Sequence, residues 1–333
     1  MKLLNQNYNM TKKELSEKYI SENPDMFKRE LARKMHYERP DMFKTIEEAR
    51  GSVRYAVHGS RRDTPVPGFE TQSELMKLYA IRNDKKTTQD YHITATKVGI
   101  MGDLHIPFHA EDAIAATLDY FKQKEVDAIL INGDLVDFYQ LSRWSKDPAE
   151  RPFSHEVRMT VEFLTYLRDA FPDANIYWKM GNHEDRYENF MRTNAKELIG
   201  LEDFEMSSIF DLDYLNIKLV GSRQKMKIGK LNVVHGHEFG QSIFSPVNPA
   251  RGLFLRAKAS CITNHHHQSS HHAENDINGN PTGCWSIGCL CDLRPDYRPF
   301  AFTKWNHGAA VVAVAENGNF HVDSINIIDG KVV

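Results

Sequence analysis

The sequence predicts a mixed α/β fold built in layers and preceded by a helical region. In the first 60 residues, apolar side chains recur every three or four positions, the spacing of an amphipathic helix. From about residue 93 the pattern changes to short apolar runs of strand length, with helical stretches between several of them. We therefore divide the chain into a helical region, residues 1–90, and an α/β domain, residues 91–333.

The helical region contains three predicted helices and a short internal repeat. The segment Glu22–Lys28 recurs as Glu38–Lys44, and each copy has a proline where we expect a helix to start. Two interpretations stay open: a helix-turn-helix-like reader of nucleic acid, or a module that serves only packing. Residues 59–68 have the composition of a linker. The predicted helices are Lys12–Ser21, Asp25–Tyr37 and Thr45–Val57.

The α/β domain contains nine apolar runs that we predict to be buried strands. Helices are predicted between strands at Asp112–Lys124 and Glu156–Ala170, as is typical of layered α/β folds. The segment Glu316–Asn319 has the residues of a hairpin turn, so the last two strands should be antiparallel. The predicted strands are Lys97–Met101, Ala128–Ile131, Ile176–Met180, Ile217–Val220, Leu231–Val234, Ser260–Ile262, Cys284–Ile287, Ala309–Val314 and Phe320–Ile327.

Composition argues against several classes of protein. The 333 residues carry 42 Lys and Arg against 45 Asp and Glu, a net charge of −3, so bulk charge gives no case for a nucleic-acid or membrane partner. We find no run of about 18 apolar residues and no apolar stretch at the start, so we expect a cytoplasmic protein without a membrane span. The four cysteines lack the paired spacing of a structural zinc site and are too few for a disulfide framework.

Polar residues follow five of the predicted strands directly. Because open α/β sheets bind ligands at the carboxyl ends of strands, we expect these residues to lie together. A glycine before Asp103, Asp134 and Asn182 lets the chain turn sharply. The chain has 16 histidines, and neutral imidazole is the commonest transition-metal ligand. The five segments are Gly102–His105, Asn132–Asp137, Gly181–Glu184, His235–His237 and Thr263–His267.

Together these segments resemble the calcineurin-like metallophosphoesterase superfamily, whose pattern is D-x-H, GD-x-x-D, GN-H-[DE], a later H, and GH-x-H. The resemblance covers roughly residues 96–315 and implies a layered αββα sandwich. The segments Asp103–His109 and Trp305–Gly308 are similar to a subgroup common in phages and bacteria. A phage-encoded member would act in the host cytoplasm. Asn264 departs from the glycine usual in the last block, which affects the turn but not the ligands.

The resemblance implies two divalent metal ions that share one carboxylate. Mixed carboxylate, imidazole and amide donors suit Mn²⁺, iron or Zn²⁺ better than Ca²⁺. We expect manganese, with iron, zinc, nickel or cobalt as alternatives. The implied ligands are Asp103, His105, Asp134 and His267 for one ion, and Asp134, Asn182, His235 and His265 for the other.

The resemblance also implies how the site works. Two cations about 3.5–4 Å apart clamp a phosphoryl group and acidify a bridging water, which attacks phosphorus. His183 resembles the acid or transition-state stabiliser of the superfamily, and Asp137 would orient it. We expect His237, His109 and Arg186 to support the ligands or contact the substrate.

The remaining histidines of the cluster are assigned to other surroundings. Strand alternation turns His266 away from its two neighbours, and we expect His271 and His272 in a solvated loop. Neither assignment gives these three side chains a part in the chemistry.

The sequence therefore predicts a dinuclear phosphoesterase, with phosphodiesters, nucleic acid or nucleotide, as the favoured substrates. Phe138 follows Asp137 where Ser/Thr protein phosphatases have arginine, and this argues against that branch. A phosphomonoesterase or phosphoprotein phosphatase is the alternative. A further alternative is a non-catalytic module that binds metal and DNA. DNA or RNA is thus a candidate partner, and the oligomeric state is not predicted.

Overall fold

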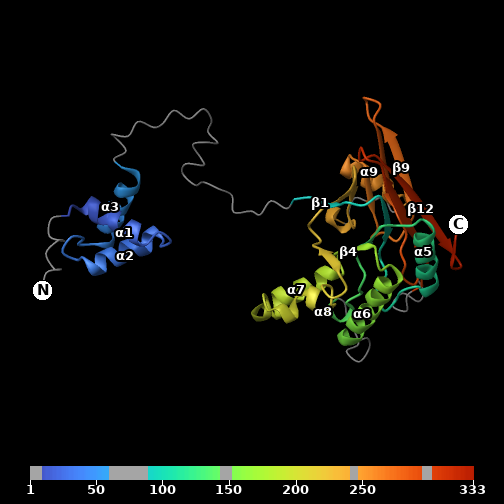
Figure 1. Cartoon of the computed structure of the whole chain (residues 1–333), viewed down its shortest axis with the longest axis horizontal. Coiled ribbons are helices and arrows are strands. Elements are labelled where there is room, and N and C mark those ends of the chain that lie inside the picture. The colour runs from blue at the N-terminus through green and yellow to red at the C-terminus, as the bar shows by residue number, and fades with distance from the viewer. Residues whose placement is uncertain (1–9, 60–88, 143–151, 241–246, 295–301) are drawn as a thin grey trace. The chain divides into compact units, whose positions relative to one another are not determined.

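The computed structural model describes residues 10–59, 89–142, 152–240, 247–294 and 302–333 (Figure 1). The chain divides into two compact units, Met1–Lys85 and Lys86–Val333, which we describe separately. All of the predicted linker except Gly59 lies outside the described residues. Among the helices described, none has the length and apolar character needed to cross a membrane.

The N-terminal unit consists of three helices, α1 (Lys12–Glu22), α2 (Lys28–Glu38) and α3 (Ile46–His58). Thr11 begins α1 with a capping box: its side chain accepts the Glu14 N–H, and the Glu14 carboxylate accepts the Thr11 N–H. A small apolar core holds the three helices together. Its buried members are Leu15, Leu31, Ala32, Met35, Phe43, Ala49 and Val53.

Both copies of the internal repeat form the connection between two helices. Asn23 and Arg39, at equivalent positions, follow α1 and α2 with nearly the same backbone angles, φ −136° and ψ 64° against φ −132° and ψ 62°. The two copies of the repeat therefore form turns that begin with the same backbone conformation. Pro24 and Pro40 lie within these turns, so the prediction that they start helices is wrong, since α2 and α3 begin four and six residues later.

The second unit contains two sheets, of which the first has seven strands in the order β13-β12-β11-β2-β3-β4-β5. Strands β2 to β5 are parallel, and β11 to β13 are antiparallel. The β11–β12 pair confirms the predicted hairpin. The bounds are β2 Lys97–Met101, β3 Ala128–Asn132, β4 Asn175–Lys179, β5 Ile217–Val220, β11 His307–Val314, β12 Phe320–Ile328 and β13 Lys331–Val332.

The second sheet has six strands in the order β1-β6-β7-β8-β10-β9. Strands β7 and β8 are parallel neighbours, so their carboxyl ends lie at the same edge. The bounds are β1 Tyr91–Ile93, β6 Met226–Ile228, β7 Leu231–Val233, β8 Cys261–Thr263, β9 Ser270–Asn275 and β10 Pro281–Ser286.

Alternate residues of the central strands face opposite sides of the first sheet. Ile100 and Leu130 pack against the second sheet, where they contact a core that includes Ile262. Ile129 and Ile131 belong to the core on the other side, beneath α5 and α6. Helix α9 covers β8, β9 and β10 (Figure 1). The helices are α5 Glu111–Gln123, α6 Phe153–Ala170, α7 Glu184–Asn194, α8 Met206–Ile209 and α9 Pro249–Ala257. The order helix, sheet, sheet, helix confirms the predicted αββα layers.

Four strands were not predicted, β1, β6, β9 and the two-residue β13. Strands β1 and β6 have only three residues each, and β9 is a polar segment that becomes a strand by pairing with β10. The prediction of a solvated loop at His271 and His272 is wrong, because both lie in β9. The His271 ring stacks on Trp285 at 4.9 Å, and the His272 ring packs on Phe254 at 4.9 Å.

Candidate metal centre

The loops after β2, β3 and β4 of the first sheet meet the loops after β7 and β8 of the second. Side chains from all five loops approach one another within hydrogen-bonding or ion-pairing distance. The metal ligands that the resemblance implied are therefore brought together, although 162 positions separate His105 from His267 in the chain. They are Asp103, His105, Asp134, Asn182, His235, His265 and His267.

The backbone at this point adopts an unusual conformation. Among the residues the structure describes, eleven other than glycine have a positive φ, and five of these are implied ligands with φ between 51° and 59°. This left-handed region is sparsely populated by L-residues, and it clusters at functional sites where the surrounding fold holds it in place. The five are Asp103, His105, Asp134, His265 and His267.

Two glycines allow the close approach of these loops. A Cβ at Gly181 would lie 2.3 Å from Asp134 Oδ1, and one at Gly133 would lie 2.3 Å from His235 Nδ1. Gly133 also has φ +88°. A larger residue at either position would push a ligand out of the cluster, so the glycines serve the approach that the sequence predicted.

The first group of four side chains comprises Asp103, His105, Asp134 and His267. The Nε2 atoms of His105 and His267 lie 3.2 Å apart and face each other. His267 Nε2 is 3.6 Å from Asp103 Oδ1, and His105 Nε2 is 3.9 Å from Asp134 Oδ2. All four side chains are buried.

The second group comprises Asp134, Asn182, His235 and His265. His235 Nε2 lies 3.2 Å from Asp134 Oδ2 and 3.2 Å from Asn182 Oδ1. The His265 ring is 5.1 Å from the His235 ring. Asp134, His235 and His265 each direct one donor atom into a common space. Asp134 therefore belongs to both groups.

The Asp103 carboxylate supports a cation at this place. Asp103 is fully buried, and neither of its oxygens has a hydrogen-bond partner among the described residues. A buried carboxylate without partners is costly unless a positive charge lies beside it. The donors around it are carboxylate oxygens, an amide oxygen and imidazole nitrogens, which together fit a divalent transition metal. The residues present therefore fit a pair of such ions.

In each group, one imidazole has a raised pKa and one has a lowered pKa. Burial opposes protonation of His235, yet the Asp134 and Asp103 carboxylates raise its pKa to about 10. Burial opposes protonation of His267 too, yet Asp103 raises its pKa well above the usual value. Burial lowers the pKa of His265 to about 3 and also lowers the pKa of His105. The carboxylates thus attract cationic charge, while two imidazoles stay neutral and able to donate a lone pair.

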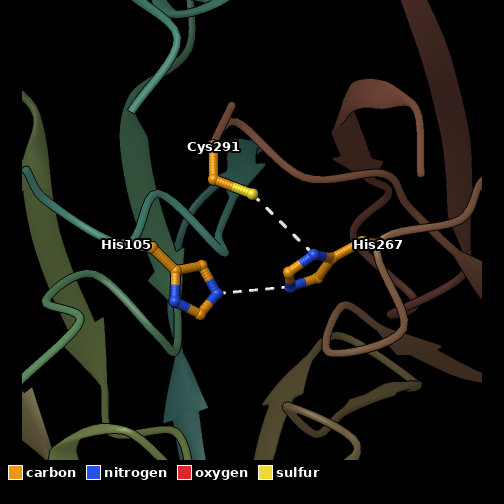
Figure 2. Close-up of side chains that lie close together, drawn as sticks. All are labelled: His105, His267 and Cys291. Atoms are coloured by element: carbon orange, nitrogen blue, oxygen red, sulfur yellow. Dashed lines mark hydrogen bonds between the residues drawn. The ribbon is translucent and has the colours of Figure 1, made fainter. Parts of the chain in front are cut away.

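In three of the four implied ligand imidazoles, the second ring nitrogen has its own partner, as is usual around metals. His235 Nδ1 donates to the Asn132 carbonyl at 2.7 Å. His105 Nδ1 lies 3.2 Å from Asp137 Oδ1. His267 Nδ1 contacts the sulfur of Cys291 at 3.8 Å (Figure 2).

His183, Asp137 and Arg186 form a connected set beside Asp134. His183 Nδ1 donates to the Asp137 carbonyl at 2.8 Å, and its backbone N–H donates to Asp134 Oδ1 at 2.9 Å. Arg186 donates from Nη1 to the Asp137 carbonyl at 2.7 Å and from Nη2 to His183 Nε2 at 3.0 Å. The His183 Nε2 atom is 3.9 Å from Asp134 Oδ2, so this nitrogen lies at the edge of the cluster.

His237 and His109 lie farther out. His237 Nε2 is 3.5 Å from Asp185 Oδ2, and its ring is 5.4 Å from the ring of His235. His109 forms a bridge with Cys291 through its backbone and lines an open hollow near His307. His266 follows His265 closely and is half-buried, with the two rings 5.0 Å apart.

Phe138, where the phosphatase branch has arginine, points into the apolar core. Its side chain is fully buried, and its ring stacks on Phe153 at 5.6 Å and on Tyr187 at 5.9 Å. Position 138 therefore brings no cation to the site. Arg143, another nearby cation in the sequence, lies outside the described residues.

Sequence reasoning missed the residues that hold the loops. The Glu184 carboxylate accepts the N–H groups of Gly181, Asp134 and Leu135 at 2.6, 3.0 and 2.8 Å, which joins the loops after β3 and β4. Asn132 donates to Asn264 Oδ1 at 2.9 Å and so links the two sheets. Asn264, which stands where the family usually has glycine, therefore accepts a hydrogen bond that a glycine could not accept. The GN-H-[DE] block contained the signal for Glu184, but only the fold reveals its partners.

Comparisons with known proteins agree with this geometry. The sequence model of one family, calcineurin-like phosphoesterase, matches residues 96–287. The Gene 54 proteins of the mycobacterial phages L5 and D29 are each 24% identical, over 246 and 248 residues that cover 71% of this chain and 95% of the relative. These relatives support the predicted resemblance to phage members.

Two solved structures are similar in fold. Vacuolar protein sorting 29 from Cryptosporidium parvum is 14% identical with a TM-score of 0.39, and the match covers 72% of this chain and 96% of that one. YfcE, a phosphoesterase from E. coli, is 16% identical with a TM-score of 0.32, covering 68% and 98%. The family assignment rests on the sequence model and not on these structures.

Proposed function

Because the chain belongs to the calcineurin-like phosphoesterase family, we propose that it hydrolyses phosphodiesters with the help of two divalent cations. The observation that carries the proposal is the buried Asp103 carboxylate, which has no hydrogen-bond partner among the described residues and lies between imidazoles that face it. Such an arrangement needs positive charge at its centre. The first and second groups would each hold one ion, with Asp134 shared, and we propose manganese as the native metal.

When bound, the two cations would neutralise the phosphoryl group and generate the nucleophile from water. The protein's own residues have three further tasks. Asp134 and Asp103 supply the buried negative charge that retains the ions. Glu184 fixes the loop of Asp134 through backbone N–H groups, so the shared carboxylate keeps its direction. Asp137 holds the rings of His105 and His183.

His183 would serve the leaving oxygen through its Nε2 atom. Its Nδ1 is committed to the Asp137 carbonyl, so Nε2 is the atom that can exchange a proton with the substrate. Arg186 now donates to that Nε2, and an arginine nitrogen can only donate. For His183 to act as an acid, Arg186 must therefore leave it. We propose that the substrate phosphate attracts Arg186 and frees His183 for proton transfer.

Two features support diesters over monoesters. A monoester dianion gains more than a diester monoanion from additional cations, and Phe138 supplies none because its side chain lies in the core. Arg186 is half-buried and already donates to the Asp137 carbonyl and to His183, so fewer of its N–H groups are available for phosphate. A site with so little positive charge beyond the metals favours the less charged substrate.

A direct assay tests both parts of this proposal. The purified chain, loaded with Mn²⁺, should hydrolyse bis-(p-nitrophenyl) phosphate with a higher kcat/KM than p-nitrophenyl phosphate, and EDTA should abolish both reactions. A clear preference for the monoester would refute the diester assignment and leave the dinuclear hydrolase. Two bound ions without hydrolysis of any ester would favour a non-catalytic module.

We further propose nucleic acid as the substrate class, and the N-terminal unit supports this. Arg29, Arg33 and Tyr37 lie four residues apart on the exposed face of α2, and Tyr37 is 88% exposed. Among residues 10–59, five of the other nine lysines and arginines form ion pairs with acids, such as Lys13 with Glu17 at 3.6 Å. Arg29 and Arg33 have no ion pair within the described part of the chain. Arginines and an exposed aromatic ring suit phosphates and unstacked bases.

Charge reversal on α2 tests this binding surface. The double change Arg29→Glu with Arg33→Glu should weaken binding of a labelled single-stranded oligonucleotide by about tenfold or more in EDTA, where no turnover occurs. The control, Lys13→Glu with Lys18→Glu, makes the same charge change on α1. It should alter binding by no more than about twofold. Equal losses in both variants would indicate a general charge effect and refute the proposed binding surface.

The cytoplasmic location of the protein stays a prediction.

A further inference from the structure

We infer that Cys291 is a positioning residue for the first metal group. Its sulfur accepts the Nδ1 proton of His267 and so holds this imidazole in the tautomer that leaves Nε2 free for a cation. The inference rests on the metal centre of the proposed function, but not on hydrolysis. It assigns a role to a cysteine that the chemistry of the site had not used.

The two nitrogens of the ring face different partners, and the Cys289 sulfur also lies close enough to interact with His267 and Cys291. Cys291 Sγ lies 3.8 Å from His267 Nδ1, and His267 Nε2 lies 3.2 Å from His105 Nε2 (Figure 2). Cys291 is 3% exposed and His267 is 7% exposed, so water does not compete strongly for either nitrogen. The Nε2 atom faces the other ligands, while the Nδ1 atom faces sulfur.

Direct coordination by Cys291 is a different interpretation, and the ring geometry argues against it. His105, His267 and Cys291 lie close enough to be considered as three ligands of one ion. However, the sulfur contacts the nitrogen on the opposite side of the imidazole from the one that faces His105. An ion held by both Nε2 atoms has the imidazole ring between it and the sulfur. Cys291 therefore acts through His267.

The backbone holds the thiol in place. The Leu290 N–H donates to the Asp103 carbonyl at 3.1 Å, and His307 Nε2 donates to the Cys291 carbonyl at 2.9 Å. The first of these contacts ties the cysteine segment to the loop that carries Asp103. Trp305 packs against the His267 ring at 4.4 Å and limits its rotation. The ring and its sulfur partner are thus both fixed before any ion binds.

Tautomer control is the reason that this contact matters. Neutral imidazole carries one proton, and a proton on Nε2 would prevent that atom from binding a metal. The partners of the other two rings, the Asn132 carbonyl and Asp137, are strong acceptors. Sulfur is a weaker acceptor, but the Cys291 sulfur is the atom that lies 3.8 Å from His267 Nδ1. Loss of the sulfur would let the proton move to Nε2.

Metal binding by the full-length chain tests the inference. Titration of the metal-free protein with Mn²⁺ alone should show that Cys291→Ala weakens one of the two ions by about 10–100-fold and leaves the other within about twofold. Cys291→Ser should recover part of the loss, because a hydroxyl oxygen also accepts. Cys284→Ala removes a buried thiol outside the site and is the matched control, for which we expect wild-type affinities.

A spectroscopic measurement separates positioning from a merely structural effect. In the Zn²⁺-loaded protein, long-range ¹H–¹⁵N spectra should show the His267 proton on Nδ1, and this signal should change in Cys291→Ala. Cys289→Ala is a second comparison. The Cys289 sulfur donates to the Asn306 carbonyl at 3.6 Å and also interacts with His267, so this variant tests whether that sulfur, and not Cys291, sets the tautomer.

The inference is overturned if Cys291→Ala binds both ions as Cys284→Ala does, or if Cys289→Ala alone reproduces the loss. If Cys291→Ala fails to fold, the Cys291→Ser variant and the tautomer spectrum decide the question. Wild-type protein that binds two ions without hydrolysing any ester would defeat the proposed function and leave this inference intact.

Discussion

The two metal groups share Asp134 but are supported in different ways. In the second group, His235 Nδ1 donates a hydrogen bond to the Asn132 carbonyl, which belongs to the backbone of strand β3. In the first group, His105 and His267 depend on the side chains of Asp137 and Cys291. A main-chain carbonyl therefore positions His235, whereas side chains position His105 and His267. We expect substitutions of Asp137 or Cys291 to weaken the first group while His235 keeps its position.

The largest effect should come from Asp134, the residue that both groups share. Asp134→Asn weakens both groups together, so we expect turnover to be abolished and bound metal to fall toward one ion or none. Elemental analysis of the purified variant measures this. Two full equivalents of metal in an active Asp134→Asn protein would show that the groups do not share this carboxylate.

His183→Ala should separate chemistry from metal binding. Because His183 serves the leaving group and belongs to neither group, kcat should fall by about 10²–10⁴ while metal content stays at the wild-type level. Esters with good leaving groups should lose less. His272→Ala is the matched control, since its ring packs on Phe254 from strand β9 and belongs to neither group. Collapse of metal content in His183→Ala would make His183 a ligand.

Asp137→Asn tests the support of the first group. The change weakens the acceptor for His105 Nδ1 but leaves the backbone carbonyl that accepts from His183. We expect the affinity for one ion to fall by about 10–100-fold and the affinity for the other to stay within about twofold. Calorimetric titration with Mn²⁺ measures both constants. Equal losses at both sites would erase the contrast between backbone and side-chain support.

Glu156 should have a smaller effect, which is a pH dependence of the folding stability. It is buried, its Oε1 accepts the Tyr139 N–H, its Oε2 has no partner among the described residues, and burial raises its pKa to about 8. The folded state thus keeps a proton that the unfolded state loses above about pH 4.5. Stability should therefore fall as pH rises from about 4.5 to about 8.

The isosteric change Glu156→Gln removes this titration. At pH 9 the variant should be more stable than wild type by about 1–3 kcal/mol, and at pH 4 the two should be similar. Urea unfolding across the pH range measures the difference. A parallel fall in stability for both proteins would assign the pH dependence to other groups.

The smallest effect should come from removing the N-terminal unit. A fragment that starts at Lys86 keeps both sheets and the ion pairs of Asp90 with Lys225 and Lys227. It should bind two ions and hydrolyse a chromogenic diester at near wild-type rates, while oligonucleotide binding weakens. An insoluble or metal-free fragment would mean that the first 85 residues are part of the catalytic fold.

Much of the fold was predictable because the strand ends carry strong local signals. Apolar runs such as Lys97–Met101 and Ile217–Val220 match strands exactly as long as predicted, since their burial pattern is written in neighbouring residues. Strands β1, β6, β9 and β13 were missed because such short or polar segments carry only a weak pattern of this kind. Their pairing partners decide their conformation.

In the candidate site too, some residues could be predicted from the sequence and others could not. Glycine followed by aspartate, asparagine or histidine after a strand pointed to the cluster, and the fold brings those side chains together. The supports were not predictable, because Asn132, Glu184 and Cys291 act across 24 to 132 positions of sequence. Contacts over such separations depend on the tertiary arrangement and leave no periodic signal in the chain.

The left-handed backbone at five of the ligands affects how mutational scans of this protein should be read. Threonine or valine at such a position would lose the donor and also strain the main chain, so the measured damage would mix two costs. Asparagine tolerates this conformation far better and isolates the loss of charge. In a deep substitution library, the gap between asparagine and β-branched replacements at Asp103 and Asp134 should therefore include the local backbone cost as well as the loss of the side-chain oxygen.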